Sequence, residues 1–464
     1  MSKNNSLLLF LCFFFFLFKI FSIKVTNFDF FGDEVQYWLW SRNLDLGYYS
    51  KPPLLPWVIA AATSVFGNAF FTIKMISVTL YCFTAIIIYL ISNKLAPDKD
   101  LAFLSAGTFF LIPAVSVSSY IISTDILLVL FWSLSILQIL VIKESQKKLN
   151  FVLLGVFVGL AFLAKYAAIY FIICLAFFII YKDGRAMFFK NRLYPFIFIL
   201  SFVLVVAPNI VWNSNNGWQT FGHTADNAGL ERMGANFFNT FVFFFSQILM
   251  IGPLIFIFFL FFIKSIRFDF NTRLLLSFSL PVFLIVLLES FLVRANANWA
   301  AVSLVAFLIL FVHLVYKFNK KLLLFNNILN FILGVFLFFL IATTSTMAPF
   351  DRIRGISSFA DYLESKNDKK IKTFVISDRL LFSNLSYIYK DKNIKIYTPH
   401  APHSKISHHF QNHKNLPEDF NKSFIFIGYL EQLNYLQNNF DFNLIEKKRV
   451  VFLNEQLEIY EIFF

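Results

Sequence analysis

Runs of about twenty apolar residues recur along this chain, and such a run crosses the hydrocarbon core of a membrane as a helix. The chain of 464 residues is 58% hydrophobic with a mean hydropathy of +0.68, more apolar than a soluble domain requires. Hydropathy predicts about eleven spans. They cover residues 7–23, 69–92, 101–117, 120–142, 150–164, 166–181, 194–212, 237–263, 274–293, 299–316 and 322–342.

The first apolar run, residues 7–23, lacks the small-residue cleavage site of a secretory signal peptide, so we expect it to remain as the first span. Residues 54–66 are a candidate for a second interfacial helix. Cys12, Cys82 and Cys174 lie inside apolar runs and are predicted to be small core residues rather than disulfide partners or metal ligands.

The net charge of +13 comes largely from Lys and Arg in short loops between spans, such as residues 143–148. The positive-inside rule then places the N-terminus in the cytoplasm. Residues 24–67, the loop 213–236 and everything after residue 343 fall on the outer side. This distribution accounts for the basic charge without a nucleic-acid partner.

The chain changes character near its end, where charged and amide residues become common. We predict two domains, a multi-span transmembrane domain over residues 1–348 and a small outer α/β domain over 349–464. In the second domain, strands are predicted at 372–377, 394–398, 423–429 and 449–453, with helices at 379–390 and 430–440.

The first outer loop, residues 28–57, is the first polar and aromatic-rich stretch of the chain. Asp33 and Glu34 open a predicted short helix, where acidic side chains suit the unpaired N–H groups and the positive end of the helix dipole. Its C-cap is predicted at Gly47, and its apolar face comprises Val35, Trp38, Leu39 and Arg42. The helix is therefore predicted to lie on the membrane and to present two carboxylates and Lys51 beside the bilayer.

Several ionisable residues gather at the outer ends of the spans. Asp125 begins the fourth span, where it either stabilises the helix dipole or serves a functional site. Any single basic residue could be a snorkelling anchor, but a group of them suits a lipid phosphate. This group comprises Arg42, Lys51, Lys74, Lys165, Arg232 and Arg294. A nearby carboxylate could act as general base on an acceptor hydroxyl, and a departing phosphate needs no protonating acid.

The outer tail holds five of the seven histidines, at positions 400, 403, 408, 409 and 413. His409 and His413 have a spacing that could bind zinc on one helix face. Prolines interrupt the region and no acidic partner is evident, so a solvated loop is the favoured interpretation.

Several motifs together resemble bacterial glycosyltransferases that use polyprenyl-phosphate sugars. This superfamily includes protein O-mannosyltransferases, the lipid A aminoarabinose transferase and rhizobial galacturonosyltransferases. The motifs that carry the resemblance are Asp33-Glu-Val-Gln-Tyr-Trp, Lys51-Pro-Pro, Ser123-Thr-Asp125, Ala164-Lys165-Tyr166, Trp212-Asn-Ser-Asn-Asn-Gly-Trp218, Arg294-Ala-Asn-Ala-Asn298-Trp299 and Ser377-Asp378-Arg379.

The resemblance implies a GT-C fold in the bacterial inner membrane, with the active site and the C-terminus in the periplasm. It implies inverting transfer from the carrier, with Asp33 as catalytic base and Glu34 or Asp125 as the alternatives. It also implies that Asp125, Lys51, Lys74 and Lys165 lie around the donor phosphate and sugar, and we predict Arg42, Tyr166 and Arg294 as further donor-binding residues. Ser50 replaces an acidic residue that takes part in a metal site in the aminoarabinose transferase, so no metal ligand is assigned and a divalent metal stays open.

The favoured function is transfer of a hexose or pentose from a polyprenyl-phosphate donor to a periplasmic acceptor, such as lipopolysaccharide, lipid A or another envelope glycolipid. A protein acceptor is the alternative within the same chemistry. A flippase for lipid-linked sugars would show symmetric halves and mid-bilayer charges, which this sequence lacks. A scaffold would leave the Asp33 and Lys51 motifs unexplained.

Overall fold

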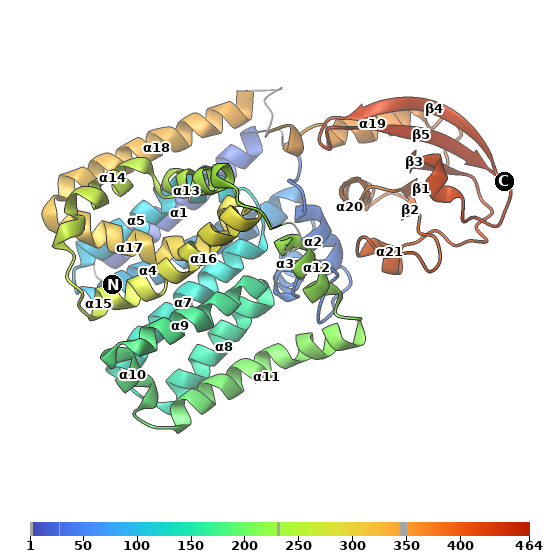
Figure 1. The fold of residues 1–464 in the computed structure, drawn as a ribbon. Helices are drawn as coiled ribbons and strands as arrows, with labels where there is room; N and C mark the ends of the chain where they lie inside the picture. The colour runs from blue at the N-terminus through green and yellow to red at the C-terminus, as the bar shows by residue number, and fades with distance from the viewer. Residues whose placement is uncertain (1–2, 27, 230–232, 344–349) are drawn as a thin grey trace. The chain divides into compact units, whose positions relative to one another are not determined.

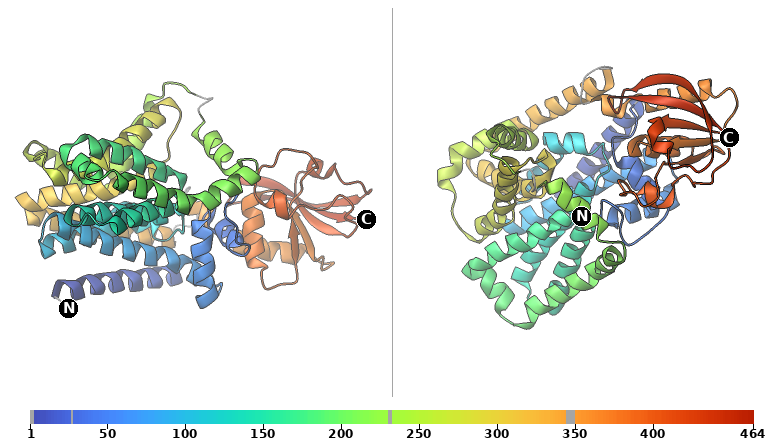
Figure 2. Two further views of the ribbon diagram at one scale, coloured as in Figure 1. Left: turned by 90° about the horizontal axis from the view of Figure 1, so that it is seen from below. Right: turned by 45° about the vertical axis from the view of Figure 1, so that its right-hand side comes forward.

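The computed structural model describes residues 3–26, 28–229, 233–343 and 350–464. The chain divides into two compact units (Figures 1 and 2). The membrane unit comprises Met1–Ser22, Asp45–Gly47 and Lys51–Phe339, and the loop–tail unit comprises Ile23–Leu44, Tyr48–Ser50 and Leu340–Phe464. The predicted domain boundary between residues 348 and 349 lies outside the described residues.

The membrane unit is built almost entirely of helices. Its longer helices are α1 (Lys3–Val25), α4 (Phe70–Leu95), α7 (Thr124–Glu144), α8 (Lys148–Ala164), α11 (Leu193–Asn215), α13 (Phe237–Ile251), α17 (Ala301–Phe318) and α18 (Lys320–Thr343). The shorter helices are α3 (Leu54–Phe66), α5 (Lys99–Leu111), α6 (Pro113–Ser118), α9 (Tyr170–Ile180), α10 (Lys182–Phe189), α12 (Gln219–Ala228), α14 (Pro253–Phe262), α15 (Phe270–Ser277) and α16 (Leu280–Leu292).

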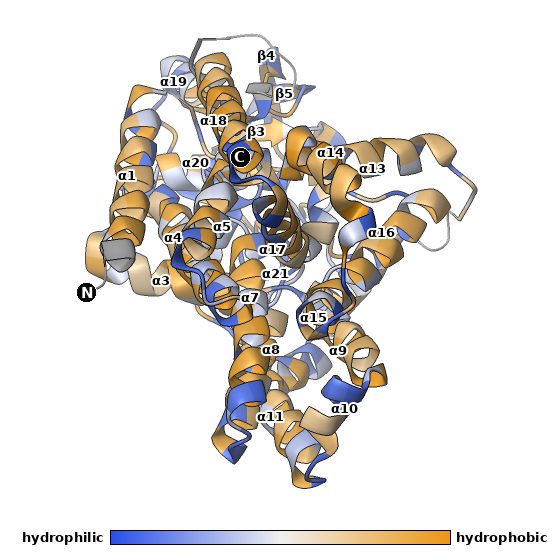
Figure 3. Cartoon of the chain, turned by 90° about the vertical axis from the view of Figure 1, so that its left-hand side faces the viewer, coloured by the Kyte–Doolittle hydropathy of each residue, from blue (hydrophilic) through white to orange (hydrophobic). Residues whose placement is uncertain are grey.

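The described residues contain seven helical segments long and apolar enough to cross a membrane, or up to nine if each of two bent pairs forms one span. One pair bends by 95° at Gly252, where the following Pro253 starts α14. This count is roughly consistent with the predicted spans, and Figure 3 shows that these helices consist mostly of hydrophobic residues, coloured orange. The predicted spans 101–117 and 150–164 correspond to α5 and α8, which have only 13 and 17 residues.

Two glycines let α8 and α11 pack closely. A Cβ atom on Gly155 would lie 1.9 Å from Ser201 Oγ, and one on Gly159 would lie 2.8 Å from Val205 Cβ. Small residues at such crossings bring helix backbones together in a membrane, where packing and hydrogen bonds hold helices together in place of a hydrophobic driving force. This pair fixes α8, which ends directly before Lys165.

The loop–tail unit contains one five-stranded sheet in the order β2-β1-β3-β5-β4. Strand β1 pairs in parallel with β2 and β3, whereas β5 is antiparallel to β3 and β4. The unit also contains α2, from the first outer loop. Its elements are α2 (Glu34–Ser41), α19 (Ile356–Lys366), β1 (Thr373–Ile376), α20 (Arg379–Ile388), β2 (Lys395–Tyr397), α21 (Phe410–His413), β3 (Phe424–Gly428), β4 (Asp441–Val450) and β5 (Glu455–Phe463).

The predictions for the tail are confirmed at its centre and wrong at its end. The buried strands β1 and β3 and the helix α20 lie where the pattern placed them. Residues 430–440 form only a short 3₁₀ turn, Leu430–Leu433, and the predicted strand 449–453 is largely the turn between β4 and β5. Most of β4 is exposed or only partly buried, so this edge strand shows no regular apolar alternation that a sequence pattern could detect.

Candidate functional site

The first turn of α2 sorts the two neighbouring carboxylates of the first outer loop. Glu34 is 1% exposed, and its Oε2 accepts a hydrogen bond of 2.6 Å from the backbone N–H of Phe31. Asp33 occupies the N-cap position but makes no capping hydrogen bond, and its side chain is 36% exposed. Glu34 therefore stabilises the loop, whereas the carboxylate of Asp33 is accessible for chemistry.

The predicted apolar face and C-cap of α2 are wrong. Side chains all around the helix are buried, while Arg42 at its end is exposed. The hydroxyl of Tyr48 contacts the carbonyl oxygens of Trp40 and Asn43 at 3.1 and 3.3 Å, so the helix end has a hydrogen-bond donor without a C-cap glycine.

Gly47 serves a different purpose, in the membrane unit. A Cβ atom there would lie 2.3 Å from Cε3 of the Trp212 indole, which only a glycine avoids. Next to it, the side chain of Asn209 on α11 donates a hydrogen bond of 2.7 Å to the carbonyl oxygen of Leu46. These contacts fix residues 45–47 against α11.

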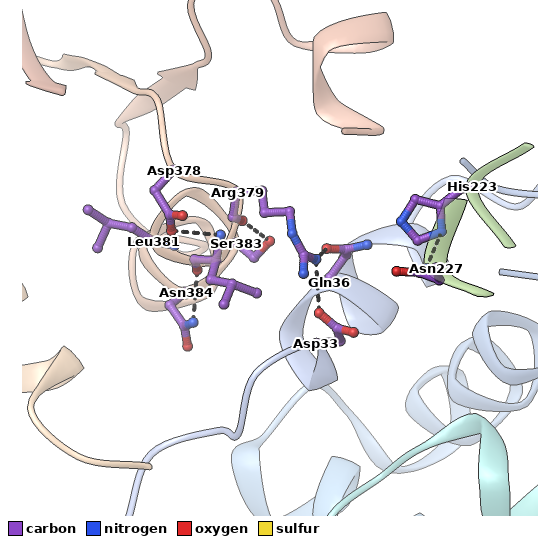
Figure 4. A network of polar contacts seen from close by, with 10 residues as sticks. Asp33, Gln36, His223, Asn227, Asp378, Arg379, Leu381, Ser383 and Asn384 are labelled. Atoms are coloured by element: carbon purple, nitrogen blue, oxygen red, sulfur yellow. Dashed lines mark hydrogen bonds and ion pairs between the residues drawn. The ribbon is translucent and has the colours of Figure 1, made fainter. Parts of the chain in front are cut away.

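Arg379, at the start of α20, binds the exposed carboxylate of α2. Its Nη1 lies 2.9 Å from Oδ1 of Asp33 and 2.7 Å from Oε1 of Gln36 (Figure 4). Gln36 is 3% exposed, so the arginine satisfies a buried amide oxygen as well as a charge. Arg379 belongs to the motif Ser377-Asp378-Arg379, but no role was predicted for it from the sequence.

A second cluster lies in the membrane unit and joins two of the predicted residues. Lys165 follows α8 directly, and its Nζ lies 2.6 Å from Oδ1 of Asp125 in the first turn of α7. The Asn298 amide donates a hydrogen bond of 2.9 Å to the other carboxylate oxygen. The side chains of Lys165 and Asp125 are only 20% and 18% exposed, so each charge requires its partner. Asn298 belongs to the motif that begins at Arg294, but it was not predicted as a site residue.

Tyr166 belongs to a buried polar network beside this cluster. Its hydroxyl contacts Oδ1 of Asn209 at 2.8 Å and the side-chain amide of Asn213 at 3.1 Å. Its ring stacks on Phe221 with centroids 4.5 Å apart. The structure therefore places Tyr166 as a link between α8, α11 and α12.

Three of the remaining predicted cations lie at separate positions in the membrane unit, whereas Arg232 lies outside the described residues. Lys51 is partly buried before α3, Lys74 is 1% exposed within α4, and Arg294 is exposed in the segment after α16. Lys74 lies 5.4 Å from the ring centroid of Phe70. Lys74 is buried near the start of α4, and its donor-binding role stays a prediction from the sequence.

Replacement of Lys165 tests the Asp125 cluster. If Lys165 binds the donor phosphate, as the motifs imply, Lys165→Ala should raise the donor KM about 10-fold, because a charge-assisted contact is lost and Asp125 is left without its cation. Lys94→Ala is the matched control, since it also removes a 2.6 Å ion pair between membrane helices, with Glu144. Steady-state kinetics on both variants should show the KM effect only for Lys165, and an equal effect in both would contradict the assignment.

His408 is buried and His409 is partly buried, unlike the predicted solvated loop, whereas His403 and His413 are exposed. His408 is 6% exposed, and the ring of His409 packs edge-on against Trp40 and Tyr48, with centroids 5.3 and 5.6 Å away. The His409 and His413 rings are 5.1 Å apart, but no group of three His, Cys, Asp or Glu side chains among the described residues is arranged to hold a metal ion. The described side chains therefore do not fit a metal site here.

Burial of these rings predicts an acid-sensitive tail. Burial, with the nearby Arg379 and His400 cations, lowers the pKa of His408 to about 4, and burial with His413 and His408 lowers that of His409 to about 3. As the pH falls below 6.5, these histidines bind protons in the unfolded chain but not in the folded tail. The free energy of unfolding therefore decreases. The loss for His408 is up to about 3 kcal/mol near pH 4.

Hydrogen exchange of β1 and α20 in the full chain, compared at pH 7 and pH 4.5, measures this loss. We expect His408→Gln to reduce the pH dependence, whereas substitution of the exposed His403 by Gln should leave it unchanged. Equal stability of the tail at both pH values would contradict the predicted acid sensitivity.

Comparisons with known proteins agree with this architecture. The family model described as dolichyl-phosphate-mannose-protein mannosyltransferase matches residues 50–212. A lipid A galacturonosyltransferase, RgtD from Rhizobium johnstonii, is 29% identical over 426 residues, which cover 88% of this chain and 89% of that protein. The crystal structure of ArnT from Cupriavidus metallidurans in the apo state superimposes with a TM-score of 0.69 at 11% identity, covering 99% of this chain and 98% of that one.

These similarities support assignment of the chain to the GT-C superfamily of glycosyltransferases. The predicted fold and enzyme class are thereby confirmed, and the chain is a multi-pass membrane protein. An undecaprenyl phosphate-aminoarabinose arabinosyl transferase from Wigglesworthia glossinidia brevipalpis is 29% identical over a shorter stretch of 130 residues, which covers 26% of this chain and 22% of that protein. The ArnT structure bound to undecaprenyl phosphate has a similar TM-score of 0.68.

Proposed function

We propose that this GT-C enzyme transfers a single sugar from a polyprenyl-phosphate carrier to lipid A or a closely related envelope glycolipid. The observation that carries the proposal is the similarity to a lipid A galacturonosyltransferase over nearly the whole of both chains. A fold shared with a transferase that binds undecaprenyl phosphate supports the class of donor.

In the proposed reaction, Asp33 accepts the proton of the acceptor hydroxyl while the hydroxyl oxygen attacks the anomeric carbon of the sugar. The bond from that carbon to the phosphate oxygen breaks, and its electron pair leaves with the polyprenyl phosphate. Attack opposite the leaving group inverts the anomeric centre. Phosphate leaves as a stable anion, so one base and a set of cations are sufficient.

The proposed donor group contains Lys51, Lys74, Lys165 and Arg294, with Tyr166, all from the membrane unit. Arg42, from the loop–tail unit, stays a prediction from the sequence. Lysine and arginine form strong charge-assisted hydrogen bonds to phosphate, which supports this assignment. Asp125 is proposed to orient Lys165, given their 2.6 Å contact. We further propose that the reaction and the tail lie on the periplasmic side of the bacterial inner membrane, as the loop charges indicate.

Purified enzyme in proteoliposomes tests this proposal directly. With undecaprenyl-phosphate galacturonose or aminoarabinose as donor and lipid A as acceptor, mass spectrometry should detect lipid A that is heavier by one sugar. The matched family model makes a membrane-exported protein the second acceptor to test. Sugar found only on protein would move the assignment to protein glycosylation, and transfer to neither acceptor from either donor would contradict the proposed substrates.

A further inference from the structure

The motif Ser377-Asp378-Arg379 forms a rigid turn at the end of a buried strand. The backbone N–H of Ser377 donates to the carbonyl oxygen of Ile427 on β3 at 3.1 Å. Asp378 then caps α20, because its Oδ1 accepts hydrogen bonds of 2.9 and 2.7 Å from the backbone N–H groups of Leu380 and Leu381. Arg379 is thus fixed as the first residue of α20, with its side chain directed toward α2 (Figure 4).

Aromatic packing holds α2 and α20 together further along. The ring of Tyr387 on α20 meets Trp38 edge-on at 4.9 Å and Phe30 edge-on at 5.0 Å. These contacts would keep the two helices in place without Arg379, since aromatic pairs of this geometry are themselves stabilising. The contacts of the arginine are therefore separable from the docking of the helices.

Arg379 contacts the carboxylate of Asp33 through one oxygen only. Its Nη1 bridges Asp33 Oδ1 and Gln36 Oε1, and among the described residues no side chain hydrogen-bonds to Asp33 Oδ2. A general base needs one oxygen with a lone pair directed at the proton that it removes. The observed geometry holds one oxygen and leaves the other for a substrate hydroxyl.

We propose that Arg379 is a positioning residue that orients the Asp33 carboxylate through Oδ1 and Gln36, so that Oδ2 faces the acceptor hydroxyl. The inference rests on the proposed function, in which Asp33 is the base. The C-terminal tail then completes the catalytic apparatus, because it supplies the residue that holds the base in place. Loss of such positioning lowers the rate of the chemical step more than it weakens donor binding.

Arg379→Ala, Arg379→Lys and Tyr387→Leu separate positioning from docking. We expect Arg379→Ala to lower kcat about 10- to 100-fold with the donor KM within about 2-fold of wild type, and Arg379→Lys to restore part of the rate. Tyr387→Leu loosens the packing of α20 but keeps the arginine, so it should lower the melting temperature more than it lowers kcat. Equal losses of rate and stability in Arg379→Ala and Tyr387→Leu would assign Arg379 to structure alone and overturn the proposal.

A double-mutant cycle distinguishes failure of this inference from failure of the proposed function. If Arg379 acts through Asp33, then adding Arg379→Ala to Asp33→Asn should not reduce the residual rate further. Inactive Asp33→Asn beside fully active Arg379→Ala would reject the positioning role and keep the base. Near-normal activity of Asp33→Asn would reject the base itself, and with it the positioning role.

Discussion

Asp33→Asn is expected to lower kcat by about 10²- to 10⁴-fold, because an amide cannot accept the proton of the acceptor hydroxyl. Donor affinity should remain within about 2-fold of wild type, since the carboxylate contributes to the transition state rather than to the binding of the carrier. The variant should also fold normally: the Asp33 side chain is 36% exposed and makes no capping hydrogen bond. Transfer assays and donor-binding titrations on the same preparation measure both quantities.

Asp45→Asn provides the matched control for this substitution. Asp45 lies in the same outer loop, and its Oδ1 accepts a hydrogen bond of 2.7 Å from the N–H of the next residue, Leu46. Loss of the Asp45 charge in Asp45→Asn should leave kcat unchanged. If Asp33→Asn retained near-normal turnover, then the base would have to be Asp125 or Glu34, and Asp125→Asn would become the decisive variant.

Lys51→Ala should raise the donor Kd by about 10- to 100-fold, because a charge-assisted hydrogen bond to phosphate contributes about 1.5–3 kcal/mol. The Pro52-Pro53 pair restricts the backbone of Lys51, which precedes α3. Binding of undecaprenyl phosphate alone, without a sugar, isolates this contact. Lys51→Arg should retain most of the affinity.

Lys148→Ala is a suitable control, because this exposed lysine begins α8 and was predicted on the cytoplasmic side. It should leave the affinity for undecaprenyl phosphate unchanged. Wild-type affinity in Lys51→Ala would remove Lys51 from the proposed phosphate group and leave that role to Lys74 and Lys165.

Much of the fold could be predicted because membrane spans and buried strands depend on local patterns. The apolar runs, β1, β3 and α20 each carry their signal within a few consecutive residues. The hairpin of β4 and β5 carries less, because β4 is an edge strand with mostly exposed or partly buried side chains. Gly47 was misinterpreted for a related reason, since its requirement for a glycine comes from Trp212, far away in the sequence.

The site was only partly predictable because its contacts join distant segments. Charge and position in the sequence indicated Asp33, Asp125 and Lys165 as candidates, but they did not show which of these residues pair. Arg379 and Asp33 are 346 residues apart in the sequence, and no local pattern in either segment predicts their contact. The burial that distinguishes Asp33 from Glu34 likewise depends on how α2 packs in three dimensions.

Mass spectrometry of envelope glycolipids is the most direct test of the proposal that this enzyme adds one sugar to lipid A or a related glycolipid, with Asp33 as the base. The strains to compare are wild type, a deletion, and the deletion complemented with the wild-type gene or with Asp33→Asn. We expect one discrete sugar mass to disappear from lipid A or the core in the deletion strain. It should return with the wild-type gene but not with Asp33→Asn. Glycolipids that are identical in all four strains would contradict the proposal.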